Sequence, residues 1–477
     1  MINHPRRRRR HGHGHGRLIF LAVILLSLGP SEPDIRTGYR VTVAIPPAYS
    51  PGYVGRAYLM GADGGGPPAF RVALSVEAGG GGGGGSYTCA LEVFLGDVRV
   101  WSSGHSSRFY VEGRCALELA ADGDLRLKGP DERIGWRTGT SGQAVERLQI
   151  QGTGNLVLVD ASDRIKWQSF NFPTDVMLWG QRLSGATRLT SYPANSTSFY
   201  SFEIEQAKVA LYLNHGGSKY SYWEFAPSLS RNITFVKLGT RGLELFNYKY
   251  KKIARITAPR SEPPRFLALD NQTGNMGLYY YSPGEGKFAA SFLALNATCD
   301  LPMSCPPYGI CTLSSACSCI RLTRKRDETG LDCGDGISGG FCGAGRPAME
   351  MIELDGVDSV IRDGPKRVNV SKEECTSLCT EDCDCAAALY SSYLRECYVY
   401  GIVIGIKQVN QGSGLSYLVK VPKGSRGRRG RSGLKRWVLV LVGVVDGLIL
   451  AAVIGGLVYY LIRKRRKRSS GGARNDS

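Results

Sequence analysis

Residues 117–140 read LELAADGDLRLKGPDERIGWRTGT, and residues 148–171 read LQIQGTGNLVLVDASDRIKWQSFN. The two stretches align without a gap, so that Gly123 falls on Gly154 and Trp136 falls on Trp167. Each copy has leucine at alternate positions, which turns one face of a strand inward. Each also has a Gly-Asx pair, which supplies the positive φ of a tight hairpin. The repeat predicts two matching hairpins whose tryptophans share one aromatic core.

The β pattern continues on both sides of this repeat. Residues 79–85 are seven consecutive glycines, which predict a flexible insertion within a loop. Residues 185–298 hold further short runs of strand type (SFYSFEIE, KVALYLN, YSYWEF, FLALD and MGLYYYS) and a weaker echo of the turn at Gly274 and Asn275. We therefore predict a mainly β protein with a second β domain at 185–298.

The number of cysteines is even, so all of them can pair. In an oxidising compartment such cysteines predict a disulfide framework rather than zinc sites. Residues 299–341 begin with a run too short to bury an apolar core, so disulfides must hold it. In residues 342–421, Ser371 and Glu374 form a capping box ahead of a short helix that carries Cys375 and Cys379 on one face. The strands ECYVYGIVIG and LSYLVKV follow. The fourteen cysteines are Cys89, Cys115, Cys299, Cys305, Cys311, Cys317, Cys319, Cys333, Cys342, Cys375, Cys379, Cys383, Cys385 and Cys397.

Both ends of the chain carry apolar runs. Residues 1–30 predict a signal peptide, because a basic stretch precedes an apolar run too short to cross ~30 Å of hydrocarbon. A signal anchor is the alternative. Residues 437–462 hold one charge, Asp446, and predict a single transmembrane helix, with a basic stalk at 422–436 and a tail at 463–477. The expected topology is type I in the plasma membrane, with the N-terminus outside and the tail in the cytosol.

The charge and the glycosylation motifs agree with this topology. The formal net charge is +19, but it is concentrated in the N-terminal stretch, the stalk and the tail, so a nucleic-acid partner is not expected. Five sequons for N-glycosylation lie before the predicted membrane helix, at Asn195, Asn232, Asn271, Asn296 and Asn369.

The stretch WQSFNFPTDVMLWGQ, residues 167–181, resembles a characteristic block of plant bulb-type (G-type) lectin domains. Residues 299–341 resemble the EGF-like module of S-locus glycoproteins, and residues 342–421 resemble a PAN/apple domain. The whole order is similar to S-domain receptor-like kinases and closest to their relatives without a kinase, the PAN domain-containing proteins. This resemblance implies a β-prism lectin fold over residues 31–184, made of three short sheets around a pseudo-threefold axis, and an α+β PAN fold.

The resemblance also implies a sugar site with the pattern Q-x-D-x-N-x-V-x-Y. The best copy here departs from the pattern, because threonine replaces the acid and valine replaces the tyrosine. The copy around Asp122 keeps an acid but loses the other positions. The alternative is that these residues serve only the hairpin and the core. The carbohydrate-site candidates are Gln151, Thr153, Asn155, Val157 and Val159.

Catalytic motifs are weak, and no catalytic residue, cofactor or metal is predicted. Residues 336–340 match G-x-S-x-G, but no histidine follows them, as a hydrolase would need. Residues 334–339 match G-x-G-x-x-G without a strand before or a helix after, so a disulfide-held loop is the better interpretation. The histidines at residues 11–15 fall in the predicted signal peptide, and residues 463–477 offer no kinase motif.

Two features near the membrane suggest contacts. Gly443, Asp446 and Gly447 lie on one stretch of the predicted helix, and we expect them to face a membrane partner such as a receptor kinase. An isolated, neutralised Asp446 is the alternative. The stalk could bind anionic wall polysaccharide or serve as a linker. We expect a receptor, co-receptor or decoy for a carbohydrate or protein ligand outside the cell; an adhesive surface glycoprotein without signalling is the alternative.

Overall fold

The computed structural model describes residues 34–45, 52–62, 66–79, 86–191, 198–227, 232–259, 262–320, 333, 341–342, 348–410, 414–423 and 436–469. The chain divides into two compact units. The larger unit is Met1–Ile320 with Gly330–Lys420, and the smaller is Arg321–Thr329 with Val421–Ser477. The expected signal peptide lies outside the described residues.

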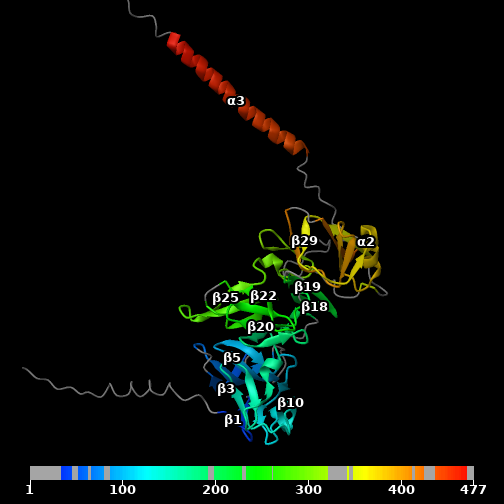
Figure 1. The fold of residues 1–477 in the computed structure, drawn as a ribbon. Helices are drawn as coiled ribbons and strands as arrows, with labels where there is room; N and C mark the ends of the chain where they lie inside the picture. Colours follow the sequence, from blue (N-terminus) through cyan, green and yellow to red (C-terminus); the bar gives the residue numbers. More distant parts are fainter. Residues whose placement is uncertain are drawn as a thin grey trace, which may run out of the picture. The chain divides into compact units, whose positions relative to one another are not determined.

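Three antiparallel sheets form the first module, in the blue and cyan part of Figure 1. One is β1 (Ile35–Arg36), β11 (Arg147–Ile150), β12 (Leu156–Val159) and β13 (Ile165–Gln168). The second is β10 (Ile134–Arg137), β9 (Leu125–Lys128), β8 (Arg114–Leu119) and β2 (Arg40–Ala44). The third is β3 (Val54–Ala62), β4 (Phe70–Ala78), β5 (Tyr87–Leu95) and β6 (Val98–Ser102), with β7 (Tyr110–Val111) on β5.

The three sheets share one apolar core, because buried residues of all three belong to a single cluster. The two hairpins expected from the repeat are β8–β9 and β11–β12, and their turn glycines Gly123 and Gly154 have φ of 85° and 82°. Trp136 and Trp167 lie 5.9 Å apart between ring centroids, so the predicted aromatic contact is confirmed.

Three more antiparallel sheets form the second module, drawn mainly in green in Figure 1. They are β14 (Val176–Leu178), β23 (Phe266–Leu269), β24 (Met276–Ser282) and β25 (Lys287–Leu293); β15 (Arg182–Ser184), β20 (Phe235–Gly239), β21 (Gly242–Phe246) and β22 (Lys252–Thr257); and β16 (Leu189–Thr190), β17 (Ser198–Ile204), β18 (Val209–His215) and β19 (Ser218–Phe225). The boundary expected at residue 184 therefore follows two strands, β14 and β15, that pair within the second module.

A cysteine-rich segment and a helix-on-sheet domain complete the larger unit. One sheet is β27 (Cys317–Cys319), β26 (Gly309–Cys311), β33 (Ile406–Gln408) and β29 (Val357–Ser359). The other is β28 (Met349–Leu354), β34 (Leu415–Pro422), β31 (Ala387–Ser391), β32 (Glu396–Tyr400) and β30 (Lys366–Val368). The short 3-10 turns are η1 (Pro130–Glu132), η2 (Ser169–Asn171) and η3 (Thr298–Asp300).

The helix of this domain, α2 (Lys372–Glu381), begins where the capping box predicts. Ser371 Oγ accepts from Glu374 N at 3.1 Å, and the Glu374 carboxylate accepts from Ser371 N at 2.6 Å. Cys375 and Cys379 both have no exposed surface, which confirms that one helix face is buried against the sheet.

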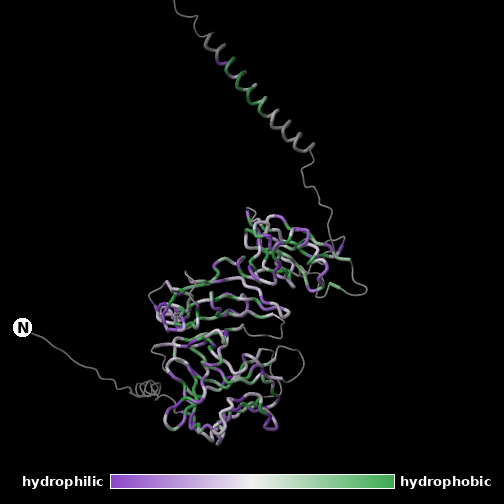
Figure 2. Tube along the Cα trace, turned by 45° about the vertical axis from the view of Figure 1, so that its right-hand side comes forward, coloured by the Kyte–Doolittle hydropathy of each residue, from purple (hydrophilic) through white to green (hydrophobic). Residues whose placement is uncertain are grey.

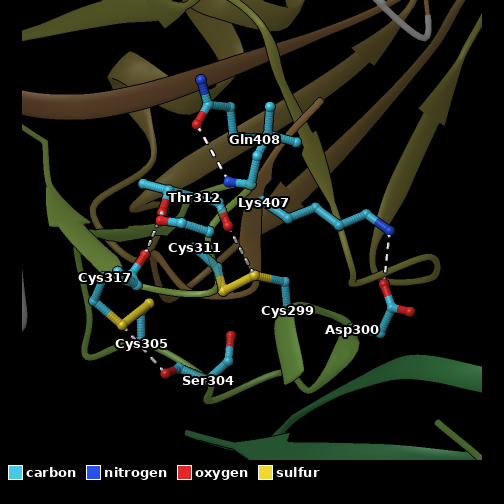
Figure 3. Close-up of a disulfide and its surroundings, with 12 residues drawn as sticks. Cys299, Asp300, Ser304, Cys305, Cys311, Thr312, Cys317, Lys407 and Gln408 are labelled. Atoms are coloured by element: carbon cyan, nitrogen blue, oxygen red, sulfur yellow. Dashed lines mark hydrogen bonds and ion pairs between the residues drawn. A yellow bond between two sulfur atoms is a disulfide. The ribbon is translucent and has the colours of Figure 1, made fainter. Parts of the chain in front are cut away.

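All fourteen cysteines pair, so the predicted disulfide framework is confirmed. The bonds are Cys89–Cys115, Cys299–Cys311, Cys305–Cys317, Cys319–Cys333, Cys342–Cys383, Cys375–Cys397 and Cys379–Cys385. Figure 3 shows Cys299–Cys311 beside an ion pair between Lys407 Nζ and Asp300 Oδ1, 2.8 Å apart. Because β26 also pairs in parallel with β33, the cysteine-rich segment and the following domain share one sheet.

The smaller unit contains the helix α3 (Arg436–Ser469), which includes the residues 437–462 expected to be helical. Among the described residues, no helix meets the length and apolarity required to cross a membrane. Figure 2 colours a stretch of α3 as hydrophobic, and described apolar side chains from Leu448 to Ile462 are about half or more exposed. The structure describes the backbone of Gly443 and Asp446 within α3 but not their surroundings, and a Cβ added at Gly447 would meet no atom within 4 Å.

Candidate functional site

The five carbohydrate-site candidates lie on the β11–β12 hairpin. Gln151 is exposed in the turn, Thr153 is half-buried, and Asn155 is 4% exposed. Val157 and Val159 follow on β12 and are 0% and 2% exposed. The hairpin therefore brings all five residues together, but it leaves neither valine open to pack on a sugar ring.

The side-chain amide of Asn155 is hydrogen-bonded to other groups of the protein. Its Nδ2 donates to Gln168 Oε1 at 2.8 Å, and its Oδ1 accepts from Ser169 Oγ and from the N–H of Phe170, both at 3.2 Å. A sugar hydroxyl at this amide would have to displace bonds that tie the hairpin to η2, and breaking such bonds costs the desolvation of each buried group.

The sister hairpin, β8–β9, repeats these bonds with a carboxylate in place of the amide. Asp124 is 1% exposed, and its Oδ1 accepts from Thr138 Oγ1 at 3.0 Å and from Gly139 N at 2.8 Å. Its Oδ2 accepts from Arg126 Nε at 3.0 Å. Ion pairs of Arg126 and Lys128 with neighbouring acids thus occupy the surface that the resemblance assigns to a second sugar.

A third copy of the motif appears only in the structure. In the two hairpins, the backbone N–H of Leu125 donates to Thr138 Oγ1 at 3.1 Å and that of Leu156 to Ser169 Oγ at 2.9 Å. On β5 the N–H of Leu91 donates to Ser103 Oγ at 2.9 Å in the same way. Each of these hydroxyl residues follows a tryptophan by two positions, so Trp101 is the third partner of Trp136 and Trp167.

The three tryptophans pack edge to face around one point. Trp101 lies 6.1 Å from Trp136 and 5.8 Å from Trp167 between ring centroids. Trp101 Nε1 donates to the carbonyl oxygen of Phe172 at 3.0 Å, which anchors the block at residues 167–181 to the cluster. Aromatic pairs in this geometry add to the energy of burial. The tryptophan cluster therefore holds the ends of all three sheets of the first module.

A cavity of about 700 Å³ opens beside the tryptophan cluster. Phe172 is 54% exposed at its rim and stacks on Trp167 with centroids 5.7 Å apart. The lining also contains polar residues, and several lining residues come from the second module. The lining includes Trp101, His105, Trp136, Arg137, Thr138, Trp167, Asn171, Phe172, Thr187, Arg188, Thr190 and Phe199.

The polar groups of this cavity offer both donors and acceptors. His105 is buried, and burial lowers its pKa, so its ring is neutral near pH 7. Its Nε2 lies 2.9 Å from the carbonyl oxygen of Thr190. Arg137 and Arg188 are exposed at the wall. Aromatic surface with a few convergent polar groups is typical of small-ligand sites, and sequence reasoning missed this cavity because two of its walls lie on different modules.

A larger cavity, about 1240 Å³, lies between the second module and the helix-on-sheet domain. Tyr220 reaches across it, because its hydroxyl accepts from the N–H of Gly401 at 2.9 Å and its ring packs on Tyr400. Charges of both signs line it, including Lys366 and Asp382. This mixture favours no single class of ligand.

The remaining predicted sites have simple positions. Asn232, Asn271, Asn296 and Asn369 are exposed, as glycan acceptors must be, while Asn195 lies outside the described residues. Glycosylation itself stays a prediction. Among the described residues no group of three or more histidine, cysteine or acidic side chains could hold a metal ion.

Comparison with known proteins identifies two domains. Residues 100–198 match the family profile described as D-mannose binding lectin, and this match includes all three tryptophans of the cluster. Residues 354–418 match the profile of the PAN domain. The resemblance predicted from the sequence is confirmed: the chain carries a bulb-type lectin domain and a PAN domain.

Two relatives from Arabidopsis thaliana match most of the chain. A G-type lectin S-receptor-like serine/threonine-protein kinase is 26% identical over 393 residues, which are 77% of this chain and 46% of the kinase. A PAN domain-containing protein is 26% identical over 373 residues, 73% of this chain and 72% of that protein. The chain thus spans less than half the length of the receptor kinase.

A solved monomeric monocot mannose-binding lectin from Gastrodia elata overlaps a smaller part of the chain. The overlap covers 28% of this chain and 93% of the lectin, with 19% identity and a TM-score of 0.19. The lectin domain is identified by its family profile and by the repeat.

Proposed function

We propose that this protein is a non-catalytic recognition protein of the cell surface, and that its lectin domain binds a carbohydrate in the cavity beside the tryptophan cluster. The observation that carries the proposal is the cavity itself, about 700 Å³ within reach of Trp136, Trp167 and the exposed ring of Phe172. Aromatic faces pack on the apolar side of sugar rings, while hydroxyl, amide and guanidinium groups bind the sugar hydroxyls.

The hairpin at residues 151–159 offers no open binding groups to a sugar, and this supports the cavity as the binding site. Asn155 is fully engaged within the protein, and both valines are buried. A neutral sugar can bind in the cavity without breaking these hydrogen bonds of Asn155. The lectin profile describes D-mannose binding, so mannosides are the first ligands to test.

We also propose that the protein is a type I plasma-membrane protein with its lectin and PAN domains outside. The basic and apolar N-terminal stretch, the apolar residues 437–462, the exposed sequons and the seven disulfides all support export. In this proposal a membrane partner such as a receptor kinase transmits the message, contacting the face that includes Gly443, Asp446 and Gly447.

The decisive experiment is a glycan array with the full-length protein and three variants. Phe172→Ala and Arg137→Ala should each weaken binding of the preferred glycan about tenfold, because each removes an exposed wall of the cavity. Tyr393→Ala is the matched control, since Tyr393 is 92% exposed in the PAN domain and should leave binding unchanged. A glycan whose binding is insensitive to both cavity variants would contradict the proposed site.

The second candidate is an adhesive glycoprotein that contacts the wall without signalling. The exposed sequons at Asn232, Asn271, Asn296 and Asn369 suit it equally. Co-purification from membranes separates the two: a receptor kinase that associates with the protein only when glycan is added supports recognition, and its loss in an Asp446→Leu variant supports the proposed helix face.

A further inference from the structure

One sheet of the second module has an unusual outer face. In the sheet β15-β20-β21-β22, Arg182 is directly opposite Lys237, Lys237 is opposite Glu244, and Glu244 is opposite Arg255. These four side chains therefore form one row across all four strands. Their neighbours along each strand, including Leu183, Val236, Leu245 and Ile256, are buried in the core. The row is thus the outer face.

The row is cationic because its single acid is already paired. Glu244 Oε1 lies 2.9 Å from Lys252 Nζ. Within the described part of the chain, Arg182, Lys237 and Arg255 form no ion pair; Arg182 and Lys237 are exposed, while Arg255 is half-buried and its buried Nε makes no hydrogen bond. Strands lie ~4.8 Å apart, so the cations recur at about one and two strand spacings from Lys237.

The surrounding sequence adds further positive charge. Residues 232–259 contain six lysines and arginines and one acid, Glu244. Lys249 and Lys251 are exposed at the tip of the β21–β22 hairpin. The whole chain is basic mainly at its ends, so this sheet is a local concentration of charge within the folded part.

An aromatic platform lies beside the row. The Arg182 guanidinium lies 3.6 Å from the ring centroid of Phe235 and 5.3 Å from that of Tyr250. Phe235 stacks on Phe246 with centroids 4.8 Å apart. Tyr248 is 69% exposed and Tyr250 is 68% exposed at the hairpin tip. Cation–π contact fixes Arg182 on this platform and leaves its N–H groups available for a ligand.

The turn that presents the two tyrosines is ordered. Asn247 Oδ1 accepts from the backbone N–H groups of Lys249 and Lys251, both at 3.0 Å. The N–H of Asn247 also donates to the carbonyl oxygen of Lys251 at 3.1 Å. Such an Asx turn lowers the entropy that a ligand would otherwise have to remove.

We propose that this face, defined by Arg182, Lys237, Arg255, Tyr248 and Tyr250, binds an extended polysaccharide that carries carboxylates, a polyuronate. The guanidinium and ammonium groups pair with successive carboxylates, and the two tyrosines stack on sugar rings. A lipid surface fits less well, since the exposed apolar groups here are phenols rather than aliphatic chains. An acidic protein would use the charges but not the flat aromatic platform.

The proposal does not depend on the cavity in the lectin domain, and its test uses a different ligand. Full-length protein in detergent is titrated with polygalacturonate. The double variant Arg182→Gln/Lys237→Gln should weaken binding roughly tenfold, and Tyr248→Ala/Tyr250→Ala should weaken it by a similar factor. Added salt should weaken binding of the parent protein, because exposed charges are screened.

A matched control removes the same charge elsewhere. Arg36→Gln/Lys287→Gln changes two cations that are 72% and 69% exposed on other sheets, so it should bind polygalacturonate like the parent protein. Equal loss in the control and in Arg182→Gln/Lys237→Gln would overturn the proposal, because binding would then follow net charge, including that of the basic stalk.

Two further probes identify the class of ligand. Polyglutamate should bind more weakly than polygalacturonate and should not respond to Tyr248→Ala/Tyr250→Ala. Vesicles of phosphatidylserine and phosphatidylcholine should not compete at this face. Equal or tighter binding of either probe that requires Arg182 and Lys237 would show an acidic-protein or lipid surface and would overturn the polyuronate assignment. The charge-preserving Lys237→Arg should retain polygalacturonate binding.

Discussion

At the scale of single residues, one structural role is filled by two chemical groups. Asn155 and Asp124 occupy equivalent positions in the repeat. Each accepts hydrogen bonds from a side-chain hydroxyl and from a backbone N–H, and both donors come later in the sequence than the hairpin. The amide works without charge. The carboxylate needs Arg126, whose Nε donates to it. We therefore expect the stability of the β8–β9 hairpin to depend on pH and that of the β11–β12 hairpin not to.

Asn155→Ala should destabilise the protein by about 2 kcal/mol, because it leaves Ser169 Oγ and the N–H of Phe170 without their acceptor in a buried site. Chemical denaturation monitored by tryptophan fluorescence measures the loss. Gln151→Ala, in the exposed turn, is the control and should change stability by less than about 0.5 kcal/mol. Similar losses in both variants would show that the buried amide contributes nothing special.

Asp124→Asn should reduce the dependence of stability on acid. Burial raises the pKa of Asp124, but hydrogen bonds from Arg126, the N–H of Thr140 and the Thr138 hydroxyl outweigh burial and hold it below the ordinary 3.8. A carboxyl with a depressed pKa stabilises the fold above its unfolded pKa, and this stabilisation is lost as the pH falls below that value. Urea midpoints measured from neutral pH down through 3.8 should therefore fall less steeply in Asp124→Asn than in the parent protein.

The remaining acids set the background for that comparison. Hydrogen bonds from Arg40 and Lys128 lower the pKa of Glu132 to about 2, and the pKa of Asp160 is also lowered. The variant should consequently retain part of the acid dependence. An unchanged slope would show that Asp124 is protonated alike in the folded and unfolded states.

At the scale of elements, the hairpin turns succeed because glycine is the only residue that fits them. Gly154 has φ of 82°, and a Cβ there would lie 2.4 Å from Phe70 Cε1 and 2.7 Å from Leu178 Cδ1. The turn thus packs against β4 and β14 as well as reversing the chain.

Gly154→Ala should cost about 3 kcal/mol or more, since steric overlap adds to the backbone strain of a positive φ. Gly180→Ala is a matched control, because Gly180 has φ of 84° but open space around its Cβ position. It should cost only about 1 kcal/mol. Equilibrium urea denaturation of both variants checks the difference, and equal costs would show that strain alone decides.

The elements also show how far the sequence alone reached. The repeat predicted two hairpins and the contact of Trp136 with Trp167, and the capping box predicted the start of α2, because these are local patterns. Trp101 was missed, since its copy lacks the Gly-Asx turn and carries Ala90 where the others have Asp124 and Asn155. The parallel pair of β26 with β33 joins residues about a hundred positions apart and leaves no local pattern.

The candidate site was predicted only in part, for a physical reason. The hairpin residues 151–159 come together as expected, but whether a side chain faces solvent depends on neighbours such as Gln168 and Ser169 that a sequence pattern does not place. The cavity beside the tryptophan cluster and the cationic sheet face arise from contacts between distant strands. Likewise, spacing could not decide which cysteines pair.

At the scale of the whole molecule, covalent support is unevenly distributed. Six of the seven disulfides lie between residues 299 and 397, one lies in the first module, and residues 176–293 contain no cysteine. The second module must therefore be stable through its apolar core, while the C-terminal part of the larger unit depends on its cross-links, as small domains commonly do.

Mild reduction should accordingly unfold the PAN domain before the second module. Hydrogen exchange with a water-soluble phosphine should show loss of protection in α2 and β31–β34, while β17–β25 remain protected. The reference is the oxidised protein at the same pH without phosphine. Simultaneous loss of protection in both regions would show that the second module depends on the PAN domain for its stability.

The strands β14, β15 and β16, residues 176–190, give the second module a particular weakness. In this order they supply an edge strand to each of its three sheets. We expect cleavage of a single peptide bond within residues 176–190 to loosen the edge strands of all three sheets together, whereas cleavage in a later turn should loosen only one sheet. Because the chain passes from the first module directly into β14, β15 and β16, we expect a pulling force applied through the first module to reach all three sheets of the second module by way of residues 176–190.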